Sequence, residues 1–152
     1  MSKAKRAEPG RIINRRAKFD YELGDSFVVG LQLSGGETKA LRLGHGQLAG
    51  SYVNVKDGEL WLVGAQINSS KGIYLSEDDQ IRSRKLLAHQ KEIDELIAAR
   101  AQGKTIVPLE FLTRGRFVKL RIATGKGKRR YDKRETLKRR QQERDIARQT
   151  KS

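Results

Sequence analysis

The sequence contains no cysteine among its 152 residues, and this absence excludes several classes of protein. Disulfide-rich folds, thiolate catalysis and zinc sites built from cysteine all need that side chain. Histidine is nearly as scarce, with only His45 and His89, which lie far apart in the sequence. An isolated histidine is more often an ordinary surface residue than a metal ligand or an acid-base catalyst. We therefore expect no metal ion, no cofactor and no enzyme activity.

The sequence also lacks long apolar segments. No apolar run approaches the roughly 20 residues that cross a bilayer, and residues 1–20 lack the apolar stretch of a secretory signal. We therefore expect a cytoplasmic protein without membrane contact. A phosphate-binding P-loop is absent too, because Gly125-Lys126-Gly127-Lys128 has neither the spacing nor the following Ser or Thr. The acidic run Glu77-Asp78-Asp79 is either a cation ligand or a solvated loop, and the loop is the favoured interpretation.

Positive charge is in excess, and it lies at the two ends of the chain. Of the net charge of +15, residues 1–18 carry seven Lys or Arg against one acid, and residues 126–152 carry twelve against four. The residues between them hold fourteen basic and thirteen acidic side chains, so the body is nearly neutral. Cationic segments flanking a neutral body are typical of proteins that bind a polyanion. We interpret residues 1–18 as a basic arm, 19–125 as the folded domain and 126–152 as a basic tail.

Patterns of apolar residues predict mostly antiparallel strands in the body. Residues 26–33 form a first strand, in which Gly30 marks a bulge or a close backbone approach, and residues 37–43 form a short helix that ends at Gly44. Residues 51–67 read as two strands around Asp57-Gly58, a strong hairpin signal. Residues 68–80 are polar and loop-like.

The second half of the body is predicted to contain one long helix and another hairpin. The periodicity predicts a helix over residues 84–101, with Ser83 as its N-cap and Gly103 at its end. Strands at 105–112 and 116–123 follow, with Pro108 indicating an edge or a bulge. Together these elements favour a mainly β fold, an OB-like antiparallel barrel with one short and one long helix.

The tail has helix-forming composition without an apolar stripe. Residues 135–149 are good helix formers, but Leu137 and Ile146 do not share a face. A helix of about 15 residues without tertiary contacts is marginal in water, and like charges repel. We expect a tail that is disordered when free and helical when bound to phosphate.

Several motifs, taken in order, resemble the SmpB (SsrA-binding protein) family. They are Asn14-Arg15-Arg16-Ala17 followed by Tyr21, Gly35-Gly36-Glu37-Thr38-Lys39-Ala40-Leu41-Arg42, Ser51-Tyr52-Val53, Arg82-Ser83-Arg84-Lys85-Leu86-Leu87 with Glu92-Ile93-Asp94, Val107-Pro108-Leu109, and Gly127-Lys128-Arg129-Arg130-Tyr131-Asp132-Lys133-Arg134-Glu135-Thr136. The resemblance covers residues 14 to about 148. It implies an OB-like barrel that binds the tRNA-like domain of tmRNA in trans-translation, the rescue of stalled bacterial ribosomes. It also implies a tail that enters the vacant mRNA channel of the small subunit.

The resemblance also implies which residues bind RNA. On the body these are Asn14, Arg15, Arg16, Glu37, Lys39, Arg42, Lys85 and Leu87, and in the tail the ribosome-contacting residues are Lys126, Lys128, Arg129, Tyr131, Asp132, Lys133 and Arg134. Cations can neutralise phosphate, an amide can bind a base edge, and an apolar or aromatic side chain can lie against a base. Leu87 could instead belong to the core of the predicted helix, and Glu37 could be only a helix N-terminal charge.

The chain departs from the family pattern at four positions. Val28 stands where an acidic residue is common, Gly36 and Thr38 replace bulkier or apolar residues, and Gln80 stands where proline is common. We expect these changes to alter RNA contacts and to leave the resemblance to the SmpB family intact. Two other functions remain open, a general ribosome- or rRNA-binding accessory protein and an RNA-processing enzyme. The expected partners are tmRNA, through its tRNA-like domain, and the decoding centre and mRNA channel of the small ribosomal subunit, with the protein acting as a monomer.

Overall fold

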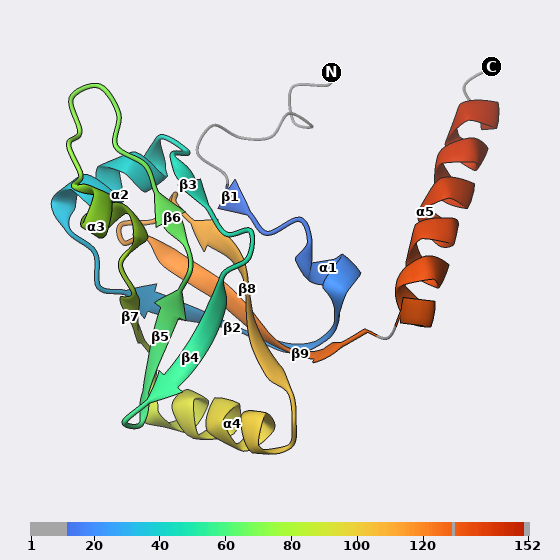
Figure 1. Ribbon diagram of the computed structural model, residues 1–152, viewed down its shortest axis with the longest axis horizontal. Helices are drawn as coiled ribbons and strands as arrows, with labels where there is room; N and C mark the ends of the chain where they lie inside the picture. Colours follow the sequence, from blue (N-terminus) through green and yellow to red (C-terminus); the bar gives the residue numbers. More distant parts are fainter. Residues whose placement is uncertain (1–11, 129, 151–152) are drawn as a thin grey trace.

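The computed structural model describes residues 12–128 and 130–150, and the described body is built around one curved antiparallel sheet (Figure 1). Its strands, in spatial order, are β1 (Ile12–Ile13), β8 (Thr105–Leu112), β9 (Lys119–Gly127), β2 (Tyr21–Leu31), β7 (Arg84–Leu87), β5 (Glu59–Val63) and β4 (Tyr52–Lys56). A small second sheet pairs β3 (Gly46–Gln47) with β6 (Gln66–Ile67). The predicted mainly β, OB-like architecture is confirmed.

The sheet curls on itself without a closed ladder of hydrogen bonds. Among the described residues, β1 and β4 are its two edges, and β4 lies against β8 to complete the curvature. Inward-facing side chains from the strands and the helices form one apolar cluster, which includes Leu41, Leu60, Leu62, Leu96, Phe111, Leu120 and Ile122. Burying this much apolar surface is the main force that holds so small a sheet together.

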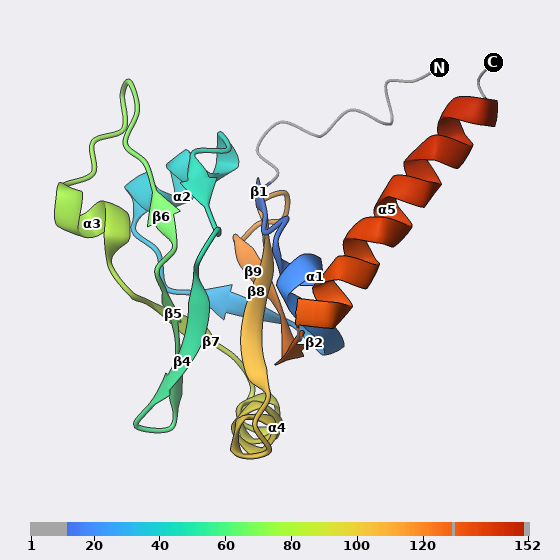
Figure 2. The same ribbon diagram turned by 45° about the vertical axis from the view of Figure 1, so that its right-hand side comes forward.

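Helices cover the ends of the curled sheet. They are α1 (Ala17–Asp20), α2 (Gly35–Arg42), α3 (Glu77–Ile81) and α4 (Gln90–Ala101). The short helix expected near residues 37–43 is confirmed as α2, which lies at one end, whereas α4 lies at the other (Figures 1 and 2). A single turn at α3 and another at α1 were not predicted, because each is too short to show a periodic pattern.

The hairpin predicted around Asp57-Gly58 is confirmed as β4 and β5. Asp57 and Gly58 have φ angles of 53° and 73°, the left-handed values that a tight two-residue turn requires at both positions. Pro108 lies beside a register shift between β8 and β9, which confirms the bulge interpretation. Gly30 is a close approach: a Cβ there would lie 3.3 Å from Leu87 Cβ.

The helix predicted over residues 84–101 is wrong in its first part. Arg84–Leu87 is strand β7, which pairs with β5 on one side and β2 on the other, and the helix begins only at Gln90. Burial alternates through this strand, from buried Arg84 to buried Leu86 with the intervening side chains outside. Ser83 is therefore no cap, and the Glu92 carboxylate accepts a hydrogen bond from the His89 backbone N–H at the true start.

The last element, α5 (Arg130–Thr150), is a helix that extends away from the sheet (Figures 1 and 2). Its helical conformation agrees with the helix expected for the bound tail, whereas disorder of the free tail stays a prediction. Strand β9 continues to Gly127, and the Lys128 backbone N–H donates to the Asp20 carbonyl at 2.9 Å. The body therefore extends at least two residues into the segment that we interpret as the tail.

Candidate nucleic-acid interface

The start of α2 is fixed by a reciprocal pair of hydrogen bonds. The Glu37 backbone N–H donates to Ser34 Oγ at 3.2 Å, and the Ser34 N–H donates to Glu37 Oε1 at 2.9 Å. This capping box satisfies two amide groups that the first helical turn leaves without partners. The segment Ser34-Gly-Gly-Glu37 thus encodes the exact residue at which α2 begins.

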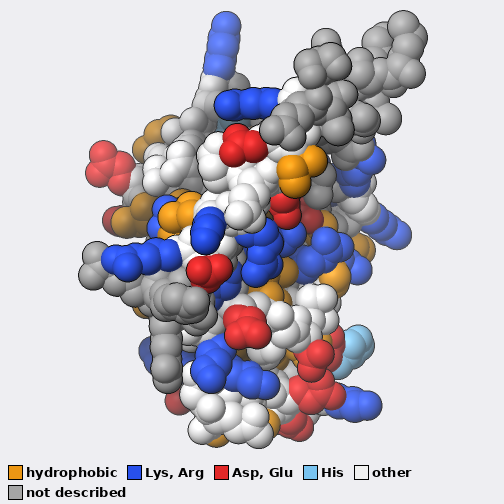
Figure 3. All heavy atoms as spheres, turned by 90° about the vertical axis from the view of Figure 1, so that its right-hand side faces the viewer, with side chains coloured by type: hydrophobic (Ala, Val, Ile, Leu, Met, Phe, Trp, Pro, Cys, Tyr) orange, Lys and Arg blue, Asp and Glu red, His pale blue; other side chains and the backbone are white. Residues whose placement is uncertain are grey.

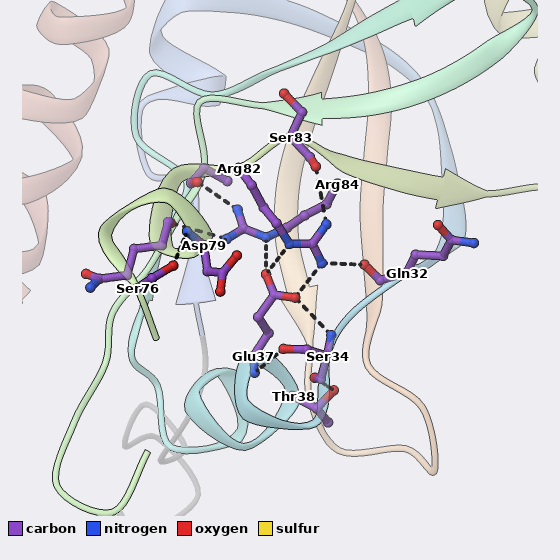
Figure 4. A network of polar contacts seen from close by, with 11 residues as sticks. Gln32, Ser34, Glu37, Thr38, Ser76, Asp79, Arg82, Ser83 and Arg84 are labelled. Atoms are coloured by element: carbon purple, nitrogen blue, oxygen red, sulfur yellow. Dashed lines mark hydrogen bonds and ion pairs between the residues drawn. The ribbon is translucent and has the colours of Figure 1, made fainter. Parts of the chain in front are cut away.

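The Glu37 carboxylate is also the centre of a buried ion cluster (Figure 4). Arg84 Nε lies 2.7 Å from Glu37 Oε2, and Arg82 Nε donates to the same oxygen at 3.1 Å. Arg84 is fully buried and Glu37 is 1% exposed. The rest of the Arg84 guanidinium donates to the carbonyls of Ala65, Asp79 and Gln80. One side chain therefore joins α2, α3 and the connection between β5 and β6.

Burial and pairing act in opposite directions on these ionisable groups. Burial raises the pKa of Glu37, but hydrogen bonds from Arg82, the Ser34 amide and Arg84 together lower it below its ordinary value. Burial lowers the pKa of Arg84, and the Glu37 carboxylate opposes that effect. Glu37 is thus a buried anion whose oxygens are already occupied. Glu37 positions α2, and its carboxylate does not face solvent.

Lys39 and Arg42 lie on the outer face of α2. Ala40 and Leu41 are buried in the core, so the helical period turns both cations outward. Arg42 is partly engaged: its guanidinium donates to the carbonyls of Thr113 and Arg116 in the loop between β8 and β9. These bonds hold the guanidinium in one place beside the exposed Lys39 side chain.

Lys85 and Leu87 lie on the outer face of β7, beside a hollow of about 600 Å³. Leu87 is 47% exposed, so the interpretation of this residue as core is wrong. Val28 from β2 lies in the same hollow and is also exposed, and Lys119 adds a second cation at its rim. The Lys85 ammonium lies 3.1 Å from a Glu59 carboxylate oxygen. The hollow therefore combines apolar side chains and two cations with the carboxylates of Glu59 and Glu92, and its apolar part can accept the face of a base.

The N-terminal candidates lie around α1, at a different part of the body. Asn14 donates from Nδ2 to the Pro108 carbonyl at 2.9 Å, which fixes its amide. Arg16 lies 3.5 Å from Asp20 and 4.7 Å from the centre of the Phe19 ring. Both Asn14 and Arg16 line a hollow of about 350 Å³, whereas Arg15 is exposed beside a smaller one of about 290 Å³.

The base of α5 lies against the same α1 segment. Lys133 Nζ is 3.4 Å from Asp20 Oδ1 and 5.7 Å from the centre of the Phe19 ring. Arg134 is exposed, and so is Lys126 at the end of β9. Arg129 lies outside the described residues, as do the side chains of Tyr131 and Asp132. Figure 3 views the molecule from the side on which α5 lies, where Lys and Arg side chains are spread among fewer acidic ones.

The structure thus arranges the predicted residues in two groups. The first, formed by α2 and β7, is joined by the Glu37 cluster and carries Lys39, Arg42, Lys85 and Leu87. The second, around α1 and the base of α5, carries Asn14, Arg15, Arg16 and Lys133. Sequence reasoning did not identify Arg82 and Arg84 as the residues that position the first group. The sequence carried no usable signal for Arg84, because the segment that contains it was predicted as a helix.

The described residues offer little that points to other chemistry. No helix among residues 12–128 and 130–150 is long and apolar enough to cross a membrane. Within the same ranges, His, Asp and Glu side chains form no group of three that could hold a metal ion.

Comparisons with known proteins agree on one family. The model of the family described as SmpB protein matches residues 11–152. An SsrA-binding protein of Trichormus variabilis is 44% identical over 142 residues, covering 91% of each chain, and one of Burkholderia vietnamiensis is 46% identical over 139 residues, covering 90% of this chain and 94% of the relative. An SsrA-binding protein of Synechocystis is 41% identical and covers 97% of this chain and 99% of its own length.

A solved structure gives the same result in three dimensions. A chain from the work titled "tmRNA-SmpB: a journey to the center of the bacterial ribosome" matches with a TM-score of 0.66 and 36% sequence identity. The match covers 84% of this chain and 94% of that one. The similarity therefore spans nearly the whole of the solved chain.

Proposed function

The chain belongs to the SmpB protein family, and we propose that it binds the tRNA-like domain of tmRNA and delivers it to stalled ribosomes in trans-translation. Its partners are tmRNA and the small ribosomal subunit, and it acts in the cytoplasm as a monomer. The observation that carries this proposal is the match to the solved tmRNA-SmpB chain over 84% of this one.

The group on α2 and β7 is suited to the tRNA-like domain. Lys39, Arg42 and Lys85 supply positive charge, and Leu87 supplies an exposed apolar side chain beside the hollow. Phosphate contacts fix position, and an apolar surface accepts an unstacked base. Glu37 contributes by holding α2 against β7 through Arg82 and Arg84 rather than by touching RNA.

Val28 makes this hollow more apolar than the family pattern suggests. The side chain is exposed and lines the same hollow as Leu87. Where the family commonly has a carboxylate, this chain presents a second apolar surface. We therefore expect contact with the face of a base in place of a polar contact with its edge.

The second group is suited to the ribosome. We propose that α5 occupies the empty mRNA channel, with Asn14, Arg15 and Arg16 beside its base. The helix has 21 residues and so extends about 30 Å from the body. Its surface is strongly basic, as a segment that lies against rRNA phosphate requires.

A binding comparison separates this function from that of a general rRNA-binding accessory protein. We expect tighter binding to a transcript of the tRNA-like domain than to an RNA duplex of the same length at equal salt. Because phosphate contacts dominate affinity, both Kd values should rise with salt, and only their ratio reports specificity. Equal affinity for the two RNAs would favour the accessory protein, and turnover of either RNA would favour a processing enzyme.

A truncation tests the division between body and tail. Ending the chain after Lys128 keeps all of β9 and the Lys128 contact with Asp20, so the body stays complete. We expect this variant to bind the tRNA-like transcript nearly as well as the full chain and to support no peptide tagging on stalled ribosomes. Tagging by the truncated protein would show that α5 does not act in the mRNA channel.

A further inference from the structure

The loop between β8 and β9, residues 113–118, is bound to α2 by the guanidinium of Arg42. Arg42 Nη1 donates to the Thr113 carbonyl at 2.8 Å, and Nη2 donates to the Arg116 carbonyl at 3.0 Å. Both bonds fix the loop backbone to the C-terminal end of α2. The loop is therefore tied directly to the helix that carries Lys39.

Phe117 is the most exposed feature of this loop. Its side chain is 68% exposed, whereas the next residue, Val118, is buried in the core. The Arg116 guanidinium lies 5.5 Å from the centre of the Phe117 ring, within the range of a cation-π contact. An anchored Val118 and a fixed backbone leave the ring on the outer surface, with an arginine beside it. Aromatic rings displayed in this way are platforms on which unpaired bases stack.

The two segments that meet beside Phe117 are rich in positive charge. Residues 38–47 and 113–118 together contain the cations Lys39, Arg42, Arg114 and Arg116, and neither segment contains Asp or Glu. All four of these side chains are exposed. A polyanion that reaches α2 therefore meets the same sign of charge in the adjoining loop.

We propose that residues 113–118, the Phe117 loop, bind an unpaired base of the tRNA-like RNA that α2 binds. The Phe117 ring stacks on the base, and Arg116 interacts with the phosphate beside it. The inference rests on the proposed function, because it takes the RNA on α2 to be the tRNA-like domain. We choose this RNA rather than rRNA as the occupant because Arg42 joins the loop directly to α2.

The first test compares Phe117 variants in binding a transcript of the tRNA-like domain. We expect Phe117→Ala to weaken binding about tenfold, the usual effect of removing one stacking platform. Phe117→Trp should retain wild-type affinity, and Phe117→Leu should bind as weakly as the alanine variant because it has no ring face. Tyr52→Ala is the matched control, since Tyr52 is a 49% exposed ring on β4, outside α2 and the loop at residues 113–118, and should leave affinity for the transcript unchanged.

Two further readouts separate stacking from a change in fold or charge. Phe117→Ala should leave the salt dependence of binding unchanged, whereas Arg116→Ala should lower the slope of log K against log salt by about 0.9. In Phe117→Trp, in which Trp61 is replaced by Phe, adding the transcript should quench the new indole fluorescence. Thermal unfolding of Phe117→Ala should match wild type, because little of this ring is buried.

The results distinguish failure of the inference from failure of the function. Wild-type affinity in Phe117→Ala, with the preference for tRNA-like RNA over duplex intact, would overturn the inference alone. Unchanged affinity for the transcript together with weaker binding to small ribosomal subunits would assign the loop to rRNA and would also overturn it. Loss of the preference in the wild-type protein would overturn the proposed function.

Discussion

Arg84 Nε lies 2.7 Å from Glu37 Oε2, and this pair, with essentially no solvent exposure, links β7 to α2 beneath the outer cations. The same guanidinium donates to three main-chain carbonyls. The cations themselves contribute little to this arrangement, because exposed ion pairs are weak. The position of α2 relative to β7 therefore depends on two buried side chains that lie beneath the exposed cations.

Replacing Arg84 should destabilise the fold strongly. Arg84→Met keeps most of the side-chain volume but removes the buried cation that pairs with Glu37 and the donor to three main-chain carbonyls, so that Glu37 keeps only Arg82 as its charged partner. Breaking a buried pair in this way costs about 3–5 kcal/mol. Urea denaturation measures the change. Arg82→Met is the control, since this side chain is 36% exposed and should cost less than half as much. An equal loss of unfolding free energy in both variants would show that Arg84 contributes no more to stability than Arg82.

Stability should fall in acid through Glu37. Folding lowers the pKa of this carboxyl, so its contribution is complete above the unfolded pKa, at about 4.3, and is lost as the pH falls through the lower folded value. Urea midpoints measured from pH 6 to pH 2.5 should drop less steeply in Glu37→Gln than in wild type. Glu59→Gln, which changes a half-exposed ion pair, should keep the wild-type slope. Parallel curves for wild type and Glu37→Gln would contradict the prediction.

Adjacent leucines in β7 should show opposite effects. Leu86→Ala removes a buried core side chain and should cost about 2–5 kcal/mol of unfolding free energy, with unchanged RNA affinity of the folded fraction. Leu87→Ala should leave stability within about 1 kcal/mol and weaken binding to the tRNA-like transcript several-fold. Denaturation and fluorescence anisotropy measure the two quantities. Similar behaviour of both variants would mean that the alternation of burial does not separate packing from binding.

Lys85 should contribute one phosphate contact. Lys85→Ala should weaken binding to the tRNA-like transcript and reduce the slope of log K against log salt by about 0.9. Glu59→Gln should do the reverse, because it releases the ammonium from its ion pair at 3.1 Å. Lys71→Ala, at an exposed position in the loop between β6 and α3, serves as the control for net charge. A slope that stays at the wild-type value in Lys85→Ala would exclude this contact.

Local signals in the sequence predicted the hairpin, α2 and the strands that follow Gly103. The Asp57-Gly58 turn and the helix stop at Gly44 are each signalled within a few residues, so one sequence is enough to interpret them. The helix prediction for residues 84–87 was wrong because the structure of this segment depends on distant parts of the chain. It is a strand because β5 and β2 lie on either side of it, and that pairing is not written in its own residues.

The candidate site could also be predicted only in part from local sequence signals. Charge counts indicated which cations are available, but the exposure of Leu87 and the burial of Glu37 depend on how β7 and α2 lie in three dimensions. The role of Arg42 in holding residues 113–118 joins segments about 70 positions apart in the chain. No periodicity within one segment reports such a contact.

The register between β2 and β9 also has a consequence for the tail. Tyr21 pairs with Gly127, and the Lys128 amide donates to Asp20, so the last ladder contacts of β9 fix the point from which α5 departs. Inserting one residue within the upstream part of β9 would reverse its inward and outward side chains or displace that departure point by about 3.3 Å. In the proposed arrangement, the depth to which α5 enters the mRNA channel would be set by strand alignment inside the body.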